Sequence, residues 1–390
     1  MVTVFSYLAI YLAVWLIVCI LWWVFKGEKY GITGIPYLFI YRTSRLNNLI
    51  ERIAAGRPTF WRTIWNMGIV VGVGAMVLGF FYFLRNLWDL LFVTAKASPV
   101  QPLVPVPGLG VSNESFPYIM LALAVLVITH ELSHGIAAVK ERIPLKATGL
   151  IWAHVLPAAF VEPDEEKLNS AKPTTKLRIF AAGSFTNIVL GIIFVLLIVN
   201  FSTTIAPFYN IVGSGVTIGS VPANLPAHAA GVQAGEIVTG INGTRISNIV
   251  DLQRFMAPVT PGSVVALQTN NGTFIIRTTA DPTNSSHALI GIGGLSDQIV
   301  FQPKMSFLPS DLPWAIYRAE FWLQGLLVGI GMINMLPIPI LDGDKFIEAA
   351  LELLKVKKAK EIRHTINYLA LSIFLLNIVL SLYRFGYVRF

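Results

Sequence analysis

The stretch VITHELSHGIAAV, residues 127–139, places two histidines and a glutamate inside one of the most apolar segments of the chain. Ionisable side chains are costly inside a membrane span and usually serve a function there. On a helix, His130 and His134 lie one turn apart on one face, so both imidazoles can bind the same metal ion. Glu131 lies about 100° around the helix from His130 and can face a metal-bound water without being a ligand.

The composition indicates an integral membrane protein. Of the 390 residues, 55% are hydrophobic and 13% are charged, whereas a soluble domain is typically about 25% charged. The net charge of +8 comes from Lys and Arg beside apolar segments, which is typical of topology-setting loops and argues against a nucleic-acid partner. Cys19 is the only cysteine, so an internal disulfide and a cysteine-based metal site are excluded.

Long apolar runs predict a polytopic α-helical membrane protein with about six transmembrane helices. The expected spans are 4–25, 66–93, 116–139, 178–201, 319–341 and 365–383. Positive charges follow the first run and do not precede it, so we interpret this run as an uncleaved span.

Basic residues set the expected orientation of these spans. They gather in three loops, 26–65, 140–178 and 343–364. The 94–115 loop carries only Lys96, so the positive-inside rule places the three basic loops in the cytoplasm. Both termini and the 202–318 segment are then outside, and the histidines lie toward the cytoplasmic side. The compact chain favours a prokaryotic cell membrane, archaeal or bacterial, over an organellar membrane.

Two segments depart from the helical pattern. Segment 202–318 is rich in Gly, Pro, Asn and Thr, with short β-type runs separated by Gly-containing turns, and predicts a β-rich soluble module. The run ATGLIWAHVLPAAFVEP, 147–163, is apolar but short and interrupted by Pro. We interpret it as a re-entrant or interfacial piece packed against protein, since irregular backbone is not tolerated in lipid. Its His154 is expected to pack or to form a local hydrogen bond.

The predicted organisation has five parts. They are an N-terminal two-span region with a basic loop (1–115), the first part of a catalytic core (116–201), the soluble module with its linkers (202–318), a span with an acidic ligand (319–345), and a basic loop with the last span (346–390).

A catalytic zinc site needs a third protein ligand. Asp342 is the candidate, because few other acids lie in apolar runs and it closes the run GMINMLPIPIL. Pro337 and Pro339 break the helix, and this broken segment must draw Asp342 inward to reach the histidines. Two alternatives stay open: a solvated Asp at a plain helix C-terminus, and a closed structural zinc site. Asp344 is expected to face the cytoplasm.

Asn187 lies in KLRIFAAGSFTNIVLG, residues 176–191, four positions after Gly183. An amide within a span can hydrogen-bond an extended substrate or stabilise a tetrahedral oxyanion. The alternative is helix packing, because Gly183, Ser184 and Gly191 are small residues that allow helices to approach closely.

The motifs HELSHG, LRIFAAGSFTN and NMLPIPILDGD, in this order on three separated spans, resemble the site-2 protease family of intramembrane metalloproteases. The resemblance covers 115–345. It implies one zinc ion per chain bound by His130, His134 and Asp342, with Glu131 as general base and Asn187 near the substrate. Ser184 departs from the Pro found there in many bacterial members, but the Asn is retained.

Two further stretches resemble parts of the same family. LPAAFVEP, 156–163, is similar to its re-entrant β-hairpin, which presents substrate as an added strand; we predict substrate contacts for Phe160 there and for Asn334 in the third motif. Residues 215–256 look like a PDZ domain, and a single PDZ at this place is similar to the eukaryotic and archaeal branch. Backbone N–H groups of a loop at Gly213–Val216, including Gly215, are expected to bind a peptide carboxylate.

Together these features predict a zinc metalloendopeptidase that cleaves in or near the transmembrane segment of a single-span membrane protein, in regulated intramembrane proteolysis. Membrane lipid and a peptide ligand of the PDZ-like domain are further expected partners, and a size filter that binds no peptide is the alternative for that domain. Two rival functions are a metal-dependent transporter, disfavoured because no inverted repeat is evident, and a catalytically inactive PDZ-bearing scaffold, disfavoured because every chemical group is present.

Overall fold

The computed structural model describes residues 4–35, 38–56, 58–107, 110–153 and 156–388. Two compact units divide the chain: Met1–Val199 with Tyr317–Phe390, and Asn200–Ile316. His154 lies outside the described residues, so the expectation for its side chain stays a prediction.

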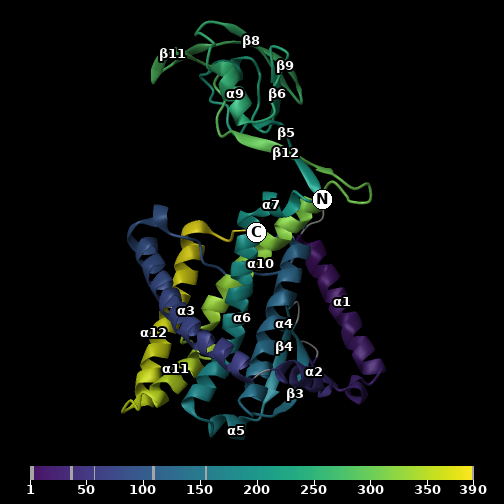
Figure 1. The fold of residues 1–390 in the computed structure, drawn as a ribbon, viewed down its shortest axis with the longest axis vertical. Helices are drawn as coiled ribbons and strands as arrows, with labels where there is room; N and C mark the ends of the chain where they lie inside the picture. Colours follow the sequence, from purple (N-terminus) through teal and green to yellow (C-terminus); the bar gives the residue numbers. More distant parts are fainter. Residues whose placement is uncertain (1–3, 36–37, 57, 108–109, 154–155, 389–390) are drawn as a thin grey trace. The chain divides into compact units, whose positions relative to one another are not determined.

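The first unit is mainly helical (Figure 1). Its helices are α1 (Val4–Val24), η1 (Gly27–Tyr30), α2 (Arg45–Ala54), α3 (Pro58–Phe92), η2 (Thr94–Lys96), α4 (Phe116–Lys140), α5 (Glu165–Asn169), α6 (Pro173–Val199), α11 (Asp342–Leu353) and α12 (Ala359–Phe385); α10 (Leu312–Asn334) begins in the second unit. Within the described residues, four helices are long and apolar enough to cross a membrane: Thr59–Phe92, Phe116–Lys140, Pro173–Val199 and Ala359–Phe385. The chain is thus an integral membrane protein, and the count of about six spans stays a prediction.

The span expected at 319–341 ends early. α10 stops at Asn334, the chain turns through 335–341, and α11 begins at Asp342. Pro337 and Pro339 cause the break, because proline supplies no N–H donor and clashes with the preceding helical turn. The expectation that Asp342 closes a span is therefore wrong, since this residue opens the next helix.

Four strands of the helical unit form one antiparallel sheet in the order β1-β2-β3-β4. They are β1 (Ile32–Ile35), β2 (Leu38–Thr43), β3 (Leu145–Ala153) and β4 (Leu156–Pro163). The β3–β4 pair is the predicted hairpin, whereas β1 and β2 come from a segment that we expected to be a basic loop. β4 lies at the sheet edge beside α4, and the re-entrant placement of the hairpin in a membrane stays a prediction.

α6 is the central helix of this unit, since it contacts α3, α4 and α11. Small residues make these contacts possible: Ala181, Ala182 and Ser184 are fully buried. A Cβ at Gly191 would lie 2.5 Å from Val328 of α10. The small residues of α6 therefore let several helices pack closely against it.

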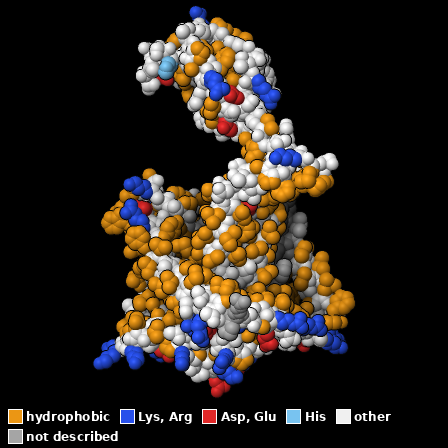
Figure 2. All heavy atoms as spheres, viewed as in Figure 1, with side chains coloured by type: hydrophobic (Ala, Val, Ile, Leu, Met, Phe, Trp, Pro, Cys, Tyr) orange, Lys and Arg blue, Asp and Glu red, His pale blue; other side chains and the backbone are white. Residues whose placement is uncertain are grey.

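Charge is concentrated at one end of the helical unit. Figure 2 shows Lys and Arg along its lower edge, where Figure 1 places α2, α5 and the connection between α11 and α12. Hydrophobic side chains cover the surface above this edge (Figure 2). The three basic loops therefore meet at the same end, which is consistent with one membrane side for all of them.

The second unit is an α+β fold. Its elements are α7 (Phe201–Ile205), β5 (Tyr209–Thr217), α8 (Pro226–Ala229), β6 (Ile237–Ile241), β7 (Thr244–Arg245), α9 (Ile249–Met256), β8 (Val264–Thr269), β9 (Gly272–Arg277), β10 (Thr279–Asp281), β11 (Asn284–Leu289) and β12 (Ser296–Pro303). One sheet has the order β12-β5-β6-β8-β9 with β7 beside β6, and β10 pairs with β11. The alternate residues Val265 and Leu267 of β8 are buried in the core, as expected for a strand with one buried face.

The predicted carboxylate-binding loop at Gly213–Val216 is part of β5, so its assignment as a loop is wrong. β12 pairs along the whole of β5, and β6 pairs with its last residues. The N–H of Gly215 donates to the carbonyl of Ser247 at 3.2 Å. A peptide carboxylate would have to compete with that carbonyl, and a peptide contact of Gly215 stays a prediction.

Buried asparagines fasten α3 to α12. Asn86 Nδ2 donates to Asn377 Oδ1 at 2.9 Å and to the carbonyl of Ser98 at 3.0 Å. Asn377 Nδ2 donates to the carbonyls of Phe83 and Ile373, both at 2.9 Å. Asn377 is fully buried, so its amide fixes the two helices to each other without help from water.

Replacing Asn377 by Leu should destabilise the protein, because a buried N–H of Asn86 loses its acceptor and the carbonyl of Phe83 loses its donor from α12. The expected cost is about 1–3 kcal/mol, measured as a lower midpoint of thermal unfolding in detergent. Asn48→Leu is the control, since Asn48 is exposed on α2. Equal midpoints for the two variants would contradict the fastening role.

Candidate metal centre

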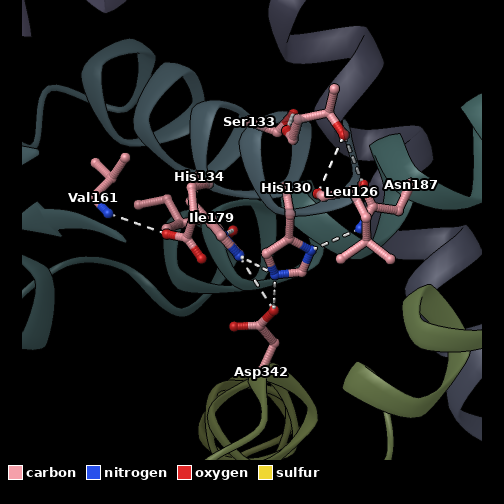
Figure 3. Close-up of polar contacts among 10 residues, drawn as sticks. Leu126, His130, Ser133, His134, Val161, Ile179, Asn187 and Asp342 are labelled. Atoms are coloured by element: carbon pink, nitrogen blue, oxygen red, sulfur yellow. Dashed lines mark hydrogen bonds and ion pairs between the residues drawn. The ribbon is translucent and has the colours of Figure 1, made fainter. Parts of the chain in front are cut away.

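Two histidines of α4 and an aspartate of α11 converge in the helical unit (Figure 3). His130 Nε2 lies 3.0 Å from Asp342 Oδ2, and His134 Nε2 lies 3.2 Å from the same oxygen. The two Nε2 atoms are 3.1 Å apart. Both histidines are buried, and 212 residues separate His130 from Asp342 along the chain. The fold thus brings the three predicted ligands together.

The donor set fits a metal ion. One ligand atom from each residue lies within 4.8 Å of the others, and the three nearest atoms are 3.0–3.2 Å apart. Three ligands of a tetrahedral zinc, each about 2.0–2.1 Å from the ion, would lie roughly 3.3 Å apart. Two imidazoles and one carboxylate also match the three-ligand pattern of catalytic zinc sites, which keep a fourth position open.

The backbone of α6 orients His134. The ring Nδ1 lies 2.7 Å from the carbonyl oxygen of Ile179, and a carbonyl can only accept, so Nδ1 carries the hydrogen. The lone pair of Nε2 then points toward Asp342. A second ring nitrogen bonded to a backbone carbonyl is the usual arrangement of a metal-binding histidine.

Gly183 lets the imidazoles lie against α6. A Cβ at this position would lie 2.5 Å from His134 Nε2 and 2.7 Å from His130 Nδ1. Real Cβ atoms essentially never approach so closely, so any larger residue must displace the rings. The sequence analysis considered Gly183 only in the alternative of helix packing, and it missed this role. The GxxxN spacing was the available signal, because it puts Gly183 and Asn187 on one face of α6.

A tight turn and a salt bridge position Asp342. A Cβ at Gly343 would lie 2.2 Å from the carbonyl oxygen of Leu336, so glycine allows the 335–341 turn to fold over the start of α11. One turn residue, Ile340, has a φ of 84°, which is an unusual conformation for a β-branched side chain.

Asp344 anchors the same end of α11 to α12. Its carboxylate accepts hydrogen bonds from Arg363 at 2.7 and 2.8 Å and from Asn367 at 2.6 Å. Burial alone would raise the pKa of Asp344, but these bonds hold it below its usual range. The expectation that Asp344 faces the cytoplasm is wrong, because the residue is buried.

Glu131 contacts the edge of the sheet. Its Oε2 accepts a hydrogen bond from the backbone N–H of Val161 in β4 at 3.1 Å. Val161 pairs with Thr148 of β3 and packs its side chain into the core that includes Ile136 of α4. Its N–H points away from β3, toward the edge where another strand would pair. The role of Glu131 as general base stays a prediction.

The predicted substrate-binding residues occupy different surroundings. Asn187 is fully buried in α6, with Nδ2 3.2 Å from His130 Nδ1. The ring of Phe160 lies against Gly149. The guanidinium carbon of Arg42 lies over this ring, 5.8 Å from the ring centroid. Because successive strand residues face opposite sides, Phe160 points away from the core that holds the side chain of Val161. Asn334 ends α10 and is partly buried.

The family model described as peptidase family M50 matches residues 118–378. This range includes all three predicted ligands and Glu131. The chain belongs to peptidase family M50. The predicted resemblance to site-2 proteases is confirmed by this match and by a relative from Arabidopsis thaliana, named a membrane-bound transcription factor site-2 protease homolog.

The relatives differ in how much of their length is matched. The Arabidopsis protein is 25% identical over 206 residues, which are 53% of this chain and 39% of that protein. An uncharacterized protein of Methanocaldococcus jannaschii is 26% identical over 322 residues, 82% of this chain and 79% of its own length. The chain therefore spans well under half of the plant relative.

Two solved structures of PDZ domains are also similar to part of the chain. They come from SdrC-like proteins of Listeria monocytogenes and Listeria innocua, and each is 25% identical to this chain. Each covers 20% of this chain, with 85% and 91% of the respective PDZ chain matched and TM-scores of 0.19 and 0.18.

Replacing Gly183 by Ala should reduce metal binding, because the added methyl group occupies the space of both imidazoles. We expect much less zinc per purified chain, measured by plasma mass spectrometry. Gly74→Ala is a matched control in α3, where a Cβ meets no described atom within 4 Å. Full zinc content in Gly183→Ala would show that the rings do not need this space.

Proposed function

We propose that this protein is an intramembrane zinc metalloprotease that hydrolyses a peptide bond in or near the transmembrane segment of a membrane-bound substrate. The observation that carries the proposal is the convergence of His130, His134 and Asp342 within 3.2 Å, in a unit built of membrane-spanning helices. Membership of peptidase family M50 supports the same activity. One ion per chain agrees with the single group of potential ligands found among the described residues.

His130, His134 and Asp342 would hold the zinc, which when bound polarises a carbonyl and makes water more acidic. Glu131 would take a proton from the water whose oxygen attacks the carbonyl carbon of the substrate. The same carboxyl would then give that proton to the departing amide nitrogen as the carbon–nitrogen bond breaks. The hydrogen bond from Val161 holds Glu131 beside the sheet edge, one residue from the first ligand.

β4 offers a place for an extended substrate. It is an edge strand of its sheet, and a peptide bond inside a helix is shielded from attack by the surrounding turns. Pairing with a strand edge would extend the substrate, as in other complexes that form by strand addition. Glu131 bonds to this same edge at Val161, so an added strand would lie beside the general base.

The basic end of the helical unit supports a proposal for its orientation in the membrane. We propose that this end faces the cytoplasm, that the PDZ-like unit lies outside, and that the host is a prokaryotic cell membrane. A single-span protein already trimmed outside is the proposed substrate, and the PDZ-like unit would bind peptides or exclude bulky ectodomains. Neither a transporter nor an inactive scaffold accounts for a carboxylate held one residue from a histidine of the cluster.

Glu131→Gln should lower the rate of cleavage by about 10²–10⁴-fold, the usual contribution of a general base, with zinc content unchanged. Asp342→Ala should lose both zinc and cleavage. The assay uses a labelled single-span substrate in liposomes, with and without a chelator, and Glu166→Gln on α5 is the control because its side chain is exposed. Cleavage that persists in Glu131→Gln would remove this residue from the mechanism.

Cysteine labelling tests the orientation. In a Cys19→Ser background, Ser285→Cys and Asn169→Cys place one exposed thiol in each unit. A membrane-impermeant maleimide on intact cells should label position 285, and position 169 only after permeabilisation, because the positive-inside rule places the loop of Asn169 in the cytoplasm. The reverse pattern would invert the proposed topology.

A further inference from the structure

The hydrogen bonds around His130 raise a question of proton placement. Asn187 Nδ2 lies 3.2 Å from His130 Nδ1, and Asn187 Oδ1 accepts from Thr129 Oγ1 at 3.0 Å (Figure 3). With the amide in this orientation, Nδ1 of His130 must accept, because an amide nitrogen can only donate. The neutral ring then carries its hydrogen on Nε2, which faces Asp342 at 3.0 Å. An Nε2 that carries a hydrogen has no lone pair for a metal.

Metal binding by His130 requires the opposite tautomer. When Nε2 is a ligand, Nδ1 carries the hydrogen and needs an acceptor. Among the described hydrogen bonds, the side chain that contacts Nδ1 of His130 is the amide of Asn187. A half-turn of its amide exchanges oxygen for nitrogen at the same positions, and the two atoms have almost the same shape. Oδ1 of Asn187 then accepts from Nδ1 of His130.

The turned amide also satisfies Thr129. The hydroxyl of Thr129 donates to the carbonyl of Val125 at 2.8 Å, which leaves its oxygen lone pairs available. After the half-turn, Asn187 Nδ2 donates to that oxygen. Each group in the chain from Val125 through Thr129 and Asn187 to His130 then has a partner of the correct kind. In the other orientation, one hydroxyl hydrogen is shared between Val125 and Asn187.

We propose that Asn187, supported by Thr129, is a positioning residue that holds His130 in the metal-binding tautomer. The proposal rests on the proposed function, since it takes His130 as a ligand. Asn187 is fully buried, and the substrate contact predicted from the sequence stays a prediction. His134 is held by a carbonyl that can only accept, and the turned amide of Asn187 presents an acceptor to His130 in the same way.

Substitutions in the full-length chain distinguish positioning from substrate contact. Asn187→Leu removes the acceptor and should weaken zinc binding by about 10–100-fold, the usual effect of losing the partner of a ligand histidine. Asn187→Asp keeps an acceptor of the same shape and should keep zinc affinity close to that of the wild type. Thr129→Val should weaken zinc binding less than Asn187→Leu does, because the amide remains. Zinc affinity is measured by competition with a chromogenic chelator in detergent.

A spectroscopic measurement gives a second readout. In cobalt-substituted protein, Asn187→Asp should shift the visible absorption bands without loss of intensity. A carboxylate partner makes the His130 ring more basic, so the ring binds the metal as a stronger ligand. A residue that only packs the helices would not produce this shift. The measurement also remains decisive if Asn187→Leu fails to fold, because it needs only the isosteric variant.

Any of three results would overturn the positioning role. The first is unchanged zinc affinity in Asn187→Leu. The second is an Asn187→Asp variant that loses zinc as severely as Asn187→Leu, and the third is an Asn187→Asp variant with unshifted cobalt bands. His130→Ala separates this outcome from failure of the proposed function. Zinc retained in His130→Ala would remove the ligand set itself, whereas zinc lost there but kept in Asn187→Leu removes only the role of Asn187.

Discussion

The close approach of α6 to α4 at Gly183 is the contact on which the site depends. The two imidazoles of α4 occupy the space in which any other residue at position 183 would place its Cβ. That Cβ would lie 2.5 Å from His134 Nε2. The backbone of α6 also contributes, since the carbonyl of Ile179 orients His134. One helix thus provides space for the ligands and fixes the direction of one of them.

The third ligand depends on a different constraint, the interruption of a helix. If α10 continued through Pro337, Asp342 would lie about two turns beyond Asn334 along one axis. Instead α10 ends at Asn334, the chain turns through 335–341, and Asp342 lies at the start of a new helix. Gly343 permits the turn, and the bonds between Asp344 and Arg363 fasten the new helix to α12. Without Gly343 and the salt bridge between Asp344 and Arg363, the carboxylate of Asp342 would be free to move away from the histidines.

The residues of the site could be predicted from the sequence because rare polar groups in apolar helices have few explanations. His130, His134 and Asp342 stood out for that reason, and the structure brings them together. Pro337 and Pro339 predicted the helix break at 335–341. They did not predict the direction in which the chain continues after the break. β1 and β2 were missed because the 26–65 segment was interpreted only through its basic residues, although ITGI and LFIYRT are largely apolar. Their pairing with β3 is also a long-range contact that local pattern does not show. Gly215 was misplaced because a Gly-rich stretch reads as a loop, whereas here β12 covers it as a strand.

Several polar side chains near the three ligands are paired within the protein. Ser133 donates to the carbonyl of Thr129 at 2.7 Å and to Thr186 Oγ1 at 2.8 Å, and Thr129 continues the pairing to Asn187. An unpaired buried polar group costs roughly 1–3 kcal/mol, so this face of α4 and α6 needs matched donors and acceptors to remain in an apolar unit. The same matching limits the tautomers that His130 can adopt, because its Nδ1 must agree with the amide beside it. Stability of the helix pair and the chemistry of the ligand are therefore set by the same hydrogen bonds.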